Sequence, residues 1–328
     1  MALLLTDTPV SYPFFEPFRI SRGASSVAET LLVILGCDGK VGRGEADGVS
    51  YAGETVDTMR DQIASVRAAA QSGELTRESL QDLLSSGGAR NAIDCAFWDL
   101  EAKQQGVSAA RLAGFEELRP LKTTITIGID TPERMAAKAA AFGPEALIKV
   151  KLGDRGDLER VEAIRTAAPT ARLIVDANQA WQFADLTHLA PRLADLGVML
   201  IEQPVPAKDD EALRSYRGPV PLCADEACKD RSSLAGIAGK YAFINIKLDK
   251  TGGLTEGLAL AREAKAAGFR LMVGCMAGTS LAMAPAFLVG QMCEVVDLDA
   301  PLFLKQDVPN AMRYDGNTLD PFDSRLWG

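Results

Sequence analysis

The chain has 328 residues, of which 47% are hydrophobic and 24% are charged, a composition typical of a globular protein with room for a large domain and a smaller one. Its net charge of −9 comes from 35 basic against 44 acidic residues, and no Lys/Arg-rich run stands out, which argues against a nucleic-acid partner. The sequence also lacks a basic leader and an apolar run of membrane-spanning length, so we expect a cytoplasmic protein without a membrane partner.

The cysteines and the histidine of the sequence limit which metal sites and which general bases the protein can have. The six cysteines form no C-x-x-C pair, and we expect them to be reduced thiols. His188 is the sole histidine, and it lies in a segment of helical periodicity. A histidine-ligated zinc site is therefore excluded, and a general base active near neutral pH has to be a Lys, Glu, Asp, Tyr or Cys.

The first 118 residues predict an α+β domain. Residues 30–36 and 41–45 have the pattern of two strands, and the Asp38-Gly39 pair between them is typical of a hairpin turn. Helical patterns follow at 53–72, 77–85 and 88–105.

From about residue 119, strand and helix patterns alternate. The expected strands are 123–128, 147–151, 172–176, 198–202, 220–224, 242–247, 270–275 and 294–297. The expected helices are 132–142, 157–167, 183–196, 209–215, 254–267 and 279–290. This rhythm predicts a parallel (β/α) barrel over 119–306, because a doubly wound sheet would place its ligand at one crevice and not at every strand end. The tail 307–328 has turn residues and no such rhythm, and we expect it to return to the first domain.

Three acids end successive predicted strands: Asp176, Glu202 and Asp225. Ends of parallel barrel strands lie side by side, so the three carboxylates should share one space and repel each other. A hard divalent cation resolves this repulsion, and three oxygen ligands suit Mg²⁺. In the alternative, each acid only caps the helix that follows it.

Two groups of lysines accompany these acids. Lys149 and Lys151 are two residues apart, so on a strand they share a face, and each should lower the proton affinity of the other. Lys247 ends a strand four positions away, on the opposite side of a barrel. A carbon between Lys151 and Lys247 could lose a proton from one face and regain it on the other. Lys250 either supports this site or is a solvated loop charge.

In these segments the chain resembles the muconate-lactonising branch of the enolase superfamily, and within it the dipeptide epimerases. The matching segments are Ile148-Lys149-Val150-Lys151, Val175-Asp176-Ala177-Asn178, Glu202-Gln203-Pro204, Ala224-Asp225-Glu226, Asn245-Ile246-Lys247-Leu248-Asp249-Lys250-Thr251-Gly252-Gly253, Gly274-Cys275-Met276 and Asp297-Leu298-Asp299. The segment Arg90-Asn91-Ala92-Ile93-Asp94-Cys95-Ala96-Phe97-Trp98-Asp99-Leu100 also resembles a helix of the family's capping domain. The resemblance implies a (β/α)7β barrel under an α+β capping domain.

The resemblance also implies a role for each matching residue. Asp176, Glu202 and Asp225 would hold one Mg²⁺, and Lys151 and Lys247 would be the two acid/base catalysts. Substrate contacts would come from Lys149, Thr126, Met276, Asp297 and Asp299, while Asn178, Glu226 and Lys250 would support the metal and the bases.

The pair Asp297 and Asp299 implies a dipeptide. Two residues apart on a strand, they share a face, and in the family such a pair receives the α-ammonium group of the substrate. In members that act on Ala-Glu, an Arg of a capping-domain loop binds the Glu side chain, and Ser25 aligns with that position. Arg19 or Arg22 could replace it, or Tyr51 could shape a different pocket.

The resemblance thus implies a Mg²⁺-dependent isomerase that inverts the Cα of the C-terminal residue of a dipeptide by two-base proton transfer through a metal-stabilised enediolate. With L-Ala-D/L-Glu as the substrate, the role would be recycling of cell-wall peptides. N-acylamino acid racemase and an o-succinylbenzoate-forming lyase are alternatives on the same scaffold. A third hypothesis is a substrate-binding or scaffold protein that keeps the barrel but has no catalytic activity. Family barrels often form homo-oligomers, but the sequence does not fix the number of subunits.

Overall fold

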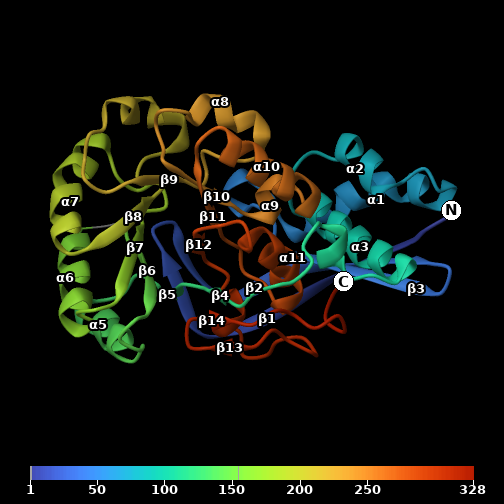
Figure 1. Ribbon diagram of the computed structural model, residues 1–328, viewed down its shortest axis with the longest axis horizontal. Helices are drawn as coiled ribbons and strands as arrows, with labels where there is room; N and C mark the ends of the chain where they lie inside the picture. Colours follow the sequence, from blue (N-terminus) through green and yellow to red (C-terminus); the bar gives the residue numbers. More distant parts are fainter. Residues whose placement is uncertain (1, 154) are drawn as a thin grey trace.

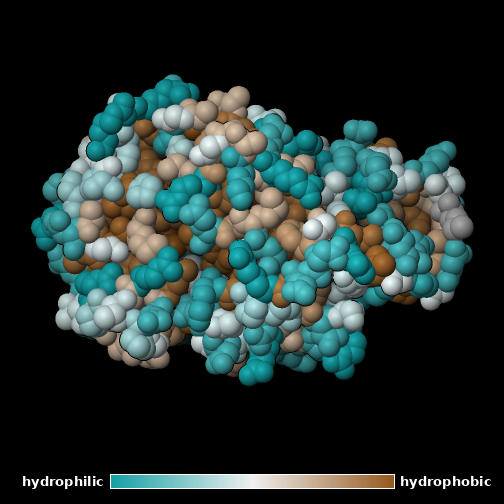
Figure 2. Space-filling view, in the orientation of Figure 1, coloured by the Kyte–Doolittle hydropathy of each residue, from teal (hydrophilic) through white to brown (hydrophobic). Residues whose placement is uncertain are grey.

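The computed structural model describes residues 2–153 and 155–328, and it contains a parallel barrel beside a smaller antiparallel domain. In Figure 1 the barrel lies on the left, and the blue and teal elements of the smaller domain extend to the right. Hydrophilic side chains cover most of the face in Figure 2, with hydrophobic ones visible between them. Within the described residues, no helix is both long and apolar enough to cross a bilayer.

The smaller domain is built on a three-stranded sheet in the order β1-β2-β3. Its strands are β1 (Leu4–Ile20), β2 (Gly23–Cys37) and β3 (Lys40–Ala46). Asp38 and Gly39 join β2 to β3 with φ angles of 50° and 73°, and this left-handed pair confirms the predicted hairpin turn. Its helical segments are η1 (Ser50–Ala52), α1 (Val56–Ser72), α2 (Arg77–Leu83), α3 (Gly88–Gln105) and α4 (Ala109–Leu112).

Eight parallel strands form the second sheet, and each adjoins its neighbour in chain order. They are β5 (Ile125–Ile127), β6 (Leu147–Lys151), β7 (Arg172–Asp176), β8 (Val198–Glu202), β9 (Leu222–Ala224), β10 (Phe243–Ile246), β11 (Arg270–Val273) and β12 (Val295–Val296). The sheet closes where the N–H of Thr124 donates to the Val296 carbonyl at 2.8 Å. The predicted barrel fold is therefore confirmed.

Helical connections cover the outside of the barrel. They are α5 (Pro132–Ala140), α6 (Asp157–Ala167), α7 (Phe183–Asp195), η2 (Ala207–Ser215), η3 (Arg231–Ser233), α8 (Leu234–Ile237), α9 (Leu248–Thr251), α10 (Leu254–Ala266) and α11 (Ser280–Gly290). The segment after β8, expected as an α-helix over 209–215, is the 3-10 helix η2. After β12 come η4 (Ala300–Phe303) and a small sheet in which β13 (Tyr314–Asp315) pairs with β14 (Thr318–Leu319) and β14 with β4 (Leu121–Lys122).

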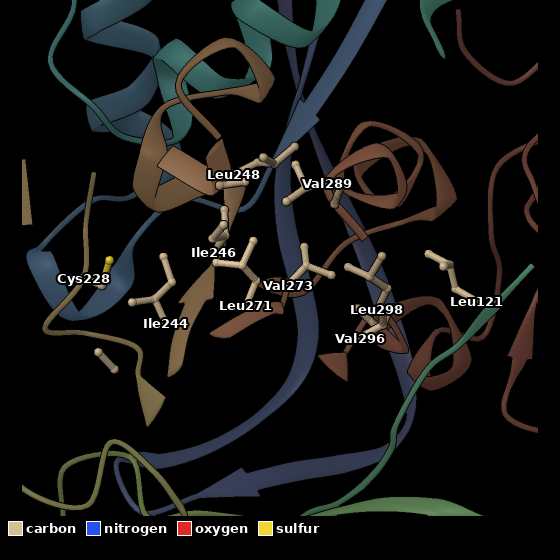
Figure 3. Packing of buried hydrophobic residues seen from close by; sticks show 14 of the residues in the cluster. Leu121, Cys228, Ile244, Ile246, Leu248, Leu271, Val273, Val289, Val296 and Leu298 are labelled. Carbon is tan, nitrogen blue, oxygen red and sulfur yellow. The ribbon is translucent and has the colours of Figure 1, made fainter. Parts of the chain in front are cut away.

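Two apolar layers hold the barrel together. Seven strands each contribute one side chain to a cluster of buried residues: Leu147, Ile174, Leu200, Cys223, Phe243, Met272 and Val295. A second layer packs the outer faces of the strands against the helices, as Figure 3 shows for Val273 of β11 and Val289 of α11. The lysines and acids expected to carry the chemistry lie further along the same strands, at or beyond their carboxyl ends.

A buried carboxylate joins the small domain to the barrel. Glu45 of β3 accepts hydrogen bonds from the backbone N–H of Thr279 at 2.8 Å and from the Thr279 hydroxyl at 2.7 Å, at the start of α11. Burial raises the pKa of Glu45 from 4.5 to about 7, against the two bonds from Thr279, which lower it. The nearby carboxylates of Asp307 and Asp249 add to the rise.

We predict that the burial of Glu45 makes the free energy of unfolding fall as pH rises. A carboxyl group with a raised pKa in the folded state binds its proton more tightly there than in the unfolded chain, so its ionisation between its two pKa values, 4.5 and about 7, costs stability. Relative to Glu45→Gln, the wild type should lose up to roughly 3 kcal/mol of unfolding free energy across this range. Urea unfolding at a series of pH values measures the difference, and parallel profiles for the two proteins would contradict it.

Candidate active site

Charged side chains gather at the carboxyl ends of the barrel strands. Lys149 and Lys151 lie on β6, Asp176 ends β7 and Glu202 ends β8, and the register pairs Lys151 with Asp176 and Asp176 with Glu202. Three more follow the next strands directly: Asp225 after β9, Lys247 after β10 and Asp297 after β12. All seven are buried, and the structure therefore brings the predicted lysines and acids together in one space.

Lys149 is the centre of this group. Its ammonium lies 2.7 Å from Glu202, 2.7 Å from Asp297 and 3.2 Å from Asp176, and its side chain is 1% exposed. Burial alone would lower the pKa of Lys149, but the carboxylates of Asp297, Glu202 and Asp176 together raise it well above its ordinary value. The direction of the pKa of Lys149 is thus set by its three carboxylate neighbours, and the expected mutual lowering of proton affinity between Lys149 and Lys151 stays a prediction.

The two lysines expected as acid/base catalysts each contact one of the three acids. The Lys151 ammonium lies 2.6 Å from Asp176 Oδ2, and the Lys247 ammonium lies 2.8 Å from Asp225 Oδ2. Their strands, β6 and β10, are separated by β7, β8 and β9, which places them across an eight-stranded barrel from one another. Both lysines line a single cavity of about 430 Å³ between the barrel and the small domain.

The three acids expected to bind a metal differ in proton affinity. Burial works to raise the pKa of each. For Asp176, the ammonium groups of Lys151 and Lys149 outweigh burial and hold the pKa below its ordinary value. Lys247 and Lys250 do the same for Asp225. Burial and the charge of Asp176 instead raise the pKa of Glu202 to about 7.

Lys250 is buried and not a solvated loop charge. Its ammonium donates to the carbonyls of Cys228 at 2.8 Å and Asn245 at 2.9 Å, and also to the Asp225 carbonyl. It lies 2.8 Å from Asp225 Oδ1 as well, and its side chain is 1% exposed. These contacts hold the segment after β9, which carries Asp225, beside the end of β10.

Asn178 and Glu226 also lie beside the acids they were expected to support. The backbone N–H of Asn178 donates to Asp176 Oδ1 at 2.9 Å, and Asn178 adopts a left-handed φ of 46°. Glu226 directly follows Asp225, and burial with the charges of Asp225 and Asp176 raises its pKa. One oxygen of Glu226, Oε2, is buried without a hydrogen-bond partner.

The pair after β12 is anchored on β5. Asp297 accepts a hydrogen bond of 2.5 Å from the Thr124 hydroxyl, and Asp299 accepts one of 2.6 Å from the backbone N–H of Thr126. Burial and the charge of Asp297 raise the pKa of Asp299 to about 7. Asp297, Asp299 and Thr126 line the same cavity as the lysines.

The remaining predicted contacts lie on the walls of this cavity. Met276, Ser25 and Asn178 line it, together with Arg22 and Tyr51 of the small domain. The hydroxyl of Ser25 is directed to its own strand, where it donates to the Val27 carbonyl at 2.7 Å. His188 is exposed on α7, away from this site, as predicted.

Three further residues hold the site and received no role in the sequence analysis. Asn245 donates its amide to Glu202 Oε1 at 2.8 Å, and Thr124 fixes Asp297. Gln203, at φ 32°, accepts hydrogen bonds from the N–H groups of Asp225 and Ala227 at 2.9 and 3.0 Å. Their common signal is an amide or hydroxyl within or next to an otherwise apolar strand, which a sequence alone does not separate from ordinary packing.

The donor set fits a hard divalent cation. Glu202 Oε2 and Asp225 Oδ1 are buried and accept no hydrogen bond of good geometry, although lysine ammonium groups lie 2.7 and 2.8 Å away. The carboxylates are turned towards these lysines, and among the described residues no group of three acids, cysteines or histidines forms a ready cage. Three carboxylates from successive strands supply the oxygen ligands that Mg²⁺ prefers.

Comparison with known proteins gives matches along nearly the whole chain. Residues 5–114 match the family model described as "Mandelate racemase / muconate lactonizing enzyme, N-terminal domain", and residues 133–316 match "Enolase C-terminal domain-like". The L-Ala-D/L-Glu epimerase of Escherichia coli K12 is 46% identical, over 94% of this chain and 97% of that protein. An N-acetyl-D-glutamate racemase of a Pseudoalteromonas species is 42% identical, over 87% and 91%.

Solved structures agree with these matches. An enolase family member from Agrobacterium tumefaciens, with bound sodium and L-Ala-L-Glu, superposes with a TM-score of 0.96 at 41% identity, over 99% of this chain and 100% of that one. A dipeptide epimerase from Cytophaga hutchinsonii, complexed with Mg and D-Ala-L-Val, gives 0.91 at 25% identity, over 98% and 94%.

The central position of Lys149 generates a stability prediction. Lys149→Met leaves three buried carboxylates without their shared cation, and removal of one partner of a buried ion pair costs about 3–5 kcal/mol. Mg²⁺ should restore part of this loss and should stabilise the variant more than the wild type. Urea unfolding in EDTA and in Mg²⁺ measures both effects. Lys138→Met is the matched control, because Lys138 pairs with the exposed Glu16. Equal responses of Lys149→Met and the wild type to Mg²⁺ would contradict the prediction.

Proposed function

The chain belongs to the mandelate racemase/muconate lactonizing group of the enolase superfamily, and from this premise we propose that it is a dipeptide epimerase. It would invert the Cα of the C-terminal residue of a dipeptide, which makes it an isomerase. The observation that carries the proposal is the placement of Lys151 and Lys247 on opposite sides of one cavity, with three carboxylates on the strands between them.

The two lysines would divide the proton transfer. With the substrate Cα between them, Lys151 would remove the proton from one face, and Lys247 would deliver a proton to the other. The opposite epimer reverses these roles. Each lysine has a carboxylate neighbour, Asp176 or Asp225, that holds its Nζ in place and balances the charge that appears on it.

Asp176, Glu202 and Asp225 would hold one Mg²⁺, as the magnesium-bound relative supports. A cation held by these three acids would supply electrostatic stabilisation for negative charge on the substrate carboxylate. Lys149, next to two of these acids and to Asp297, adds a second positive charge towards the same carboxylate. Asn178, Glu226 and Lys250 keep these groups in position.

Asp297 and Asp299 would receive the α-ammonium group of the dipeptide, with Thr126 and Met276 beside it on the cavity wall. The backbone N–H of Thr126 already orients Asp299. Burial and Asp297 raise the pKa of Asp299 to about 7, so a cation at this point favours the ionised form of the pair.

A second candidate is an N-acylamino acid racemase, which the likeness to the N-acetyl-D-glutamate racemase favours. The proton transfer would be the same. An N-acyl substrate has no ammonium group, however, and the acidic pair after β12 would then lack its partner.

Four broader expectations accompany the proposal. We place the enzyme in the cytoplasm, where its six free cysteines stay reduced, and we assign cell-wall peptide recycling as its role if Ala-Glu is the substrate. We also propose that the protein forms a homo-oligomer. Residues 1–118 would form a capping domain over a barrel of residues 119–306, and the tail 307–328 would return to the capping domain. The hydrogen bond of 3.0 Å from Trp327 to the Cys95 carbonyl supports the return of the tail.

The proposal predicts exchange of a single carbon-bound proton with solvent. Incubation with Mg²⁺ and pooled L,L-dipeptides in D₂O should add one dalton at the Cα of the C-terminal residue, as read by mass spectrometry. Lys151→Met and Lys247→Met should each abolish epimerisation, because one of the two faces is then without a catalyst. The variant that keeps the base for the L epimer should still exchange the L dipeptide.

A third variant separates the two candidate functions. Asp299→Asn should weaken exchange of dipeptides and leave exchange of N-acetyl amino acids unchanged. Labelling of N-acetyl amino acids without any labelled dipeptide would overturn the epimerase proposal and support the racemase. No labelling in either pool would overturn both.

A further inference from the structure

A buried chain of polar side chains leads away from the acids of the site. It begins at Gln203, which directly follows Glu202 at the end of β8. From there it continues through Tyr241, which comes just before β10, to Asp210 in η2. The strands β8, β9 and β10 lie side by side (Figure 1). Gln203, Tyr241 and Asp210 are all buried, so bulk solvent does not weaken the hydrogen bonds that join them.

Gln203 uses every hydrogen-bonding position of its side-chain amide. Its Oε1 accepts from the backbone N–H groups of Asp225 at 2.9 Å and Ala227 at 3.0 Å. Its Nε2 donates to the Val205 carbonyl at 3.0 Å and to the Tyr241 hydroxyl at 2.9 Å. A flipped amide would turn its NH₂ group towards two N–H donors, so these four bonds admit a single orientation of the amide.

Asp210 fixes the direction of the hydrogen bonds at Tyr241. The Tyr241 hydroxyl accepts from Gln203 and also bonds the Asp210 carboxylate, which can only accept, so the phenolic proton points to Asp210. Burial and the charge of Asp210 raise the pKa of Tyr241 above its ordinary value, which keeps this proton on the hydroxyl. The Lys240 ammonium lies 2.6 Å from Asp210 Oδ1 and supplies the counter-charge.

Every hydrogen bond of the chain therefore runs in one direction. The backbone N–H groups donate to Gln203, Gln203 donates to Tyr241, and Tyr241 donates to Asp210. Hydrogen bonds in such a row polarise one another, and a negative charge at the accepting end strengthens each of them. The charge of Asp210 thus makes Gln203 Oε1 a stronger acceptor for the backbone at Asp225.

The start of the chain is joined to two of the three acids expected to hold Mg²⁺. Gln203 follows Glu202 with a left-handed φ of 32°, which residues other than glycine seldom adopt, and it binds the backbone of Asp225. The Asp225 carboxylate is held separately, by Lys247 and Lys250 at 2.8 Å each. The backbone and the carboxylate of Asp225 are therefore fixed by different partners, and the backbone contact is the one that leads to Tyr241.

We propose that Tyr241 is a positioning residue for the metal site. Held by Asp210, it fixes the amide of Gln203 and through it the place of Asp225 after β9. The proposal rests on the Mg²⁺ site of the proposed function. Tyr241 and Asp210 are not among the residues that line the active-site cavity, so they act through Gln203 and not on the substrate.

The test measures the Kd of Mg²⁺ itself, by titration calorimetry without substrate. Tyr241→Phe keeps the ring and removes the hydroxyl that holds the Gln203 amide. The Kd should rise about 3- to 10-fold, less than the roughly 10- to 100-fold typical of residues that bond a metal ligand directly. Tyr216→Phe is the matched control, because the Tyr216 hydroxyl donates to the Val220 carbonyl just before β9, outside the chain. It should leave the Kd unchanged.

Asp210→Asn tests whether the effect passes through Tyr241. The amide keeps the size of the carboxylate and removes its charge, so the Kd should rise by a smaller factor. In the Tyr241→Phe background the same substitution should leave the Kd unchanged, because the link to Gln203 is already broken. Two factors that multiply in the double variant would mean that the two residues act separately, which overturns the proposal.

Urea unfolding separates positioning from a general loosening of the barrel. A Kd that rises equally in Tyr241→Phe and Tyr216→Phe, in step with lost unfolding free energy, overturns the proposal, and so does an unchanged Kd in Tyr241→Phe. If Tyr241→Phe does not fold, Asp210→Asn decides alone, and an unchanged Kd overturns the proposal. A wild type that binds no Mg²⁺ overturns the metal site and this proposal with it. A wild type that binds Mg²⁺ but exchanges no dipeptide proton overturns the epimerase function alone, and the Kd values still decide the role of Tyr241.

Discussion

The ion pairs among buried lysines and carboxylates are the constraint on which this structure depends. Lys149, Lys151, Lys247 and Lys250 each lie within ion-pairing distance of at least one of Asp176, Glu202, Asp225 and Asp297. An isolated charge at such depth would carry a desolvation cost of several kcal/mol. The parallel strands solve this problem geometrically, because their carboxyl ends place acids and lysines from distant parts of the sequence next to each other. The fold and the chemistry therefore both require these ion pairs between buried lysines and carboxylates.

Much of the barrel could be predicted because its signals are local. A buried parallel strand is an apolar run, and a charge at its end is visible in the sequence, as in residues 172–176 before Ala177. Helices α6 and α10 begin at the predicted residues for the same reason. The long strand β1 was not predicted. It contains Pro9, Pro13 and Pro17, which count against a strand, and it tolerates them as an edge strand of its three-stranded sheet, next to β2.

The site was predictable as a set of residues but not as a network. Strand-end positions and the family resemblance gave the lysines and acids, whereas the partner of each depends on three-dimensional placement. Lys149 illustrates the difference: the charged residue nearest to it in sequence is another lysine, Lys151, but its neighbours in space are three carboxylates. The side-chain amides of Gln203 and Asn245 form hydrogen bonds with residues at the ends of other strands, and no periodic pattern in the sequence indicates such contacts. The contacts of Arg22 with Asn178 and Glu226 could be found only in the structure, because these partners are 156 and 204 residues away along the chain.

The central place of Lys149 has a consequence for how this protein comes into being. Its ammonium already neutralises carboxylates that would otherwise need an external ion, so the barrel can close around its own counter-charges. Maturation is then separate from metal uptake, unlike in small metal-dependent domains whose folding is driven by ion binding.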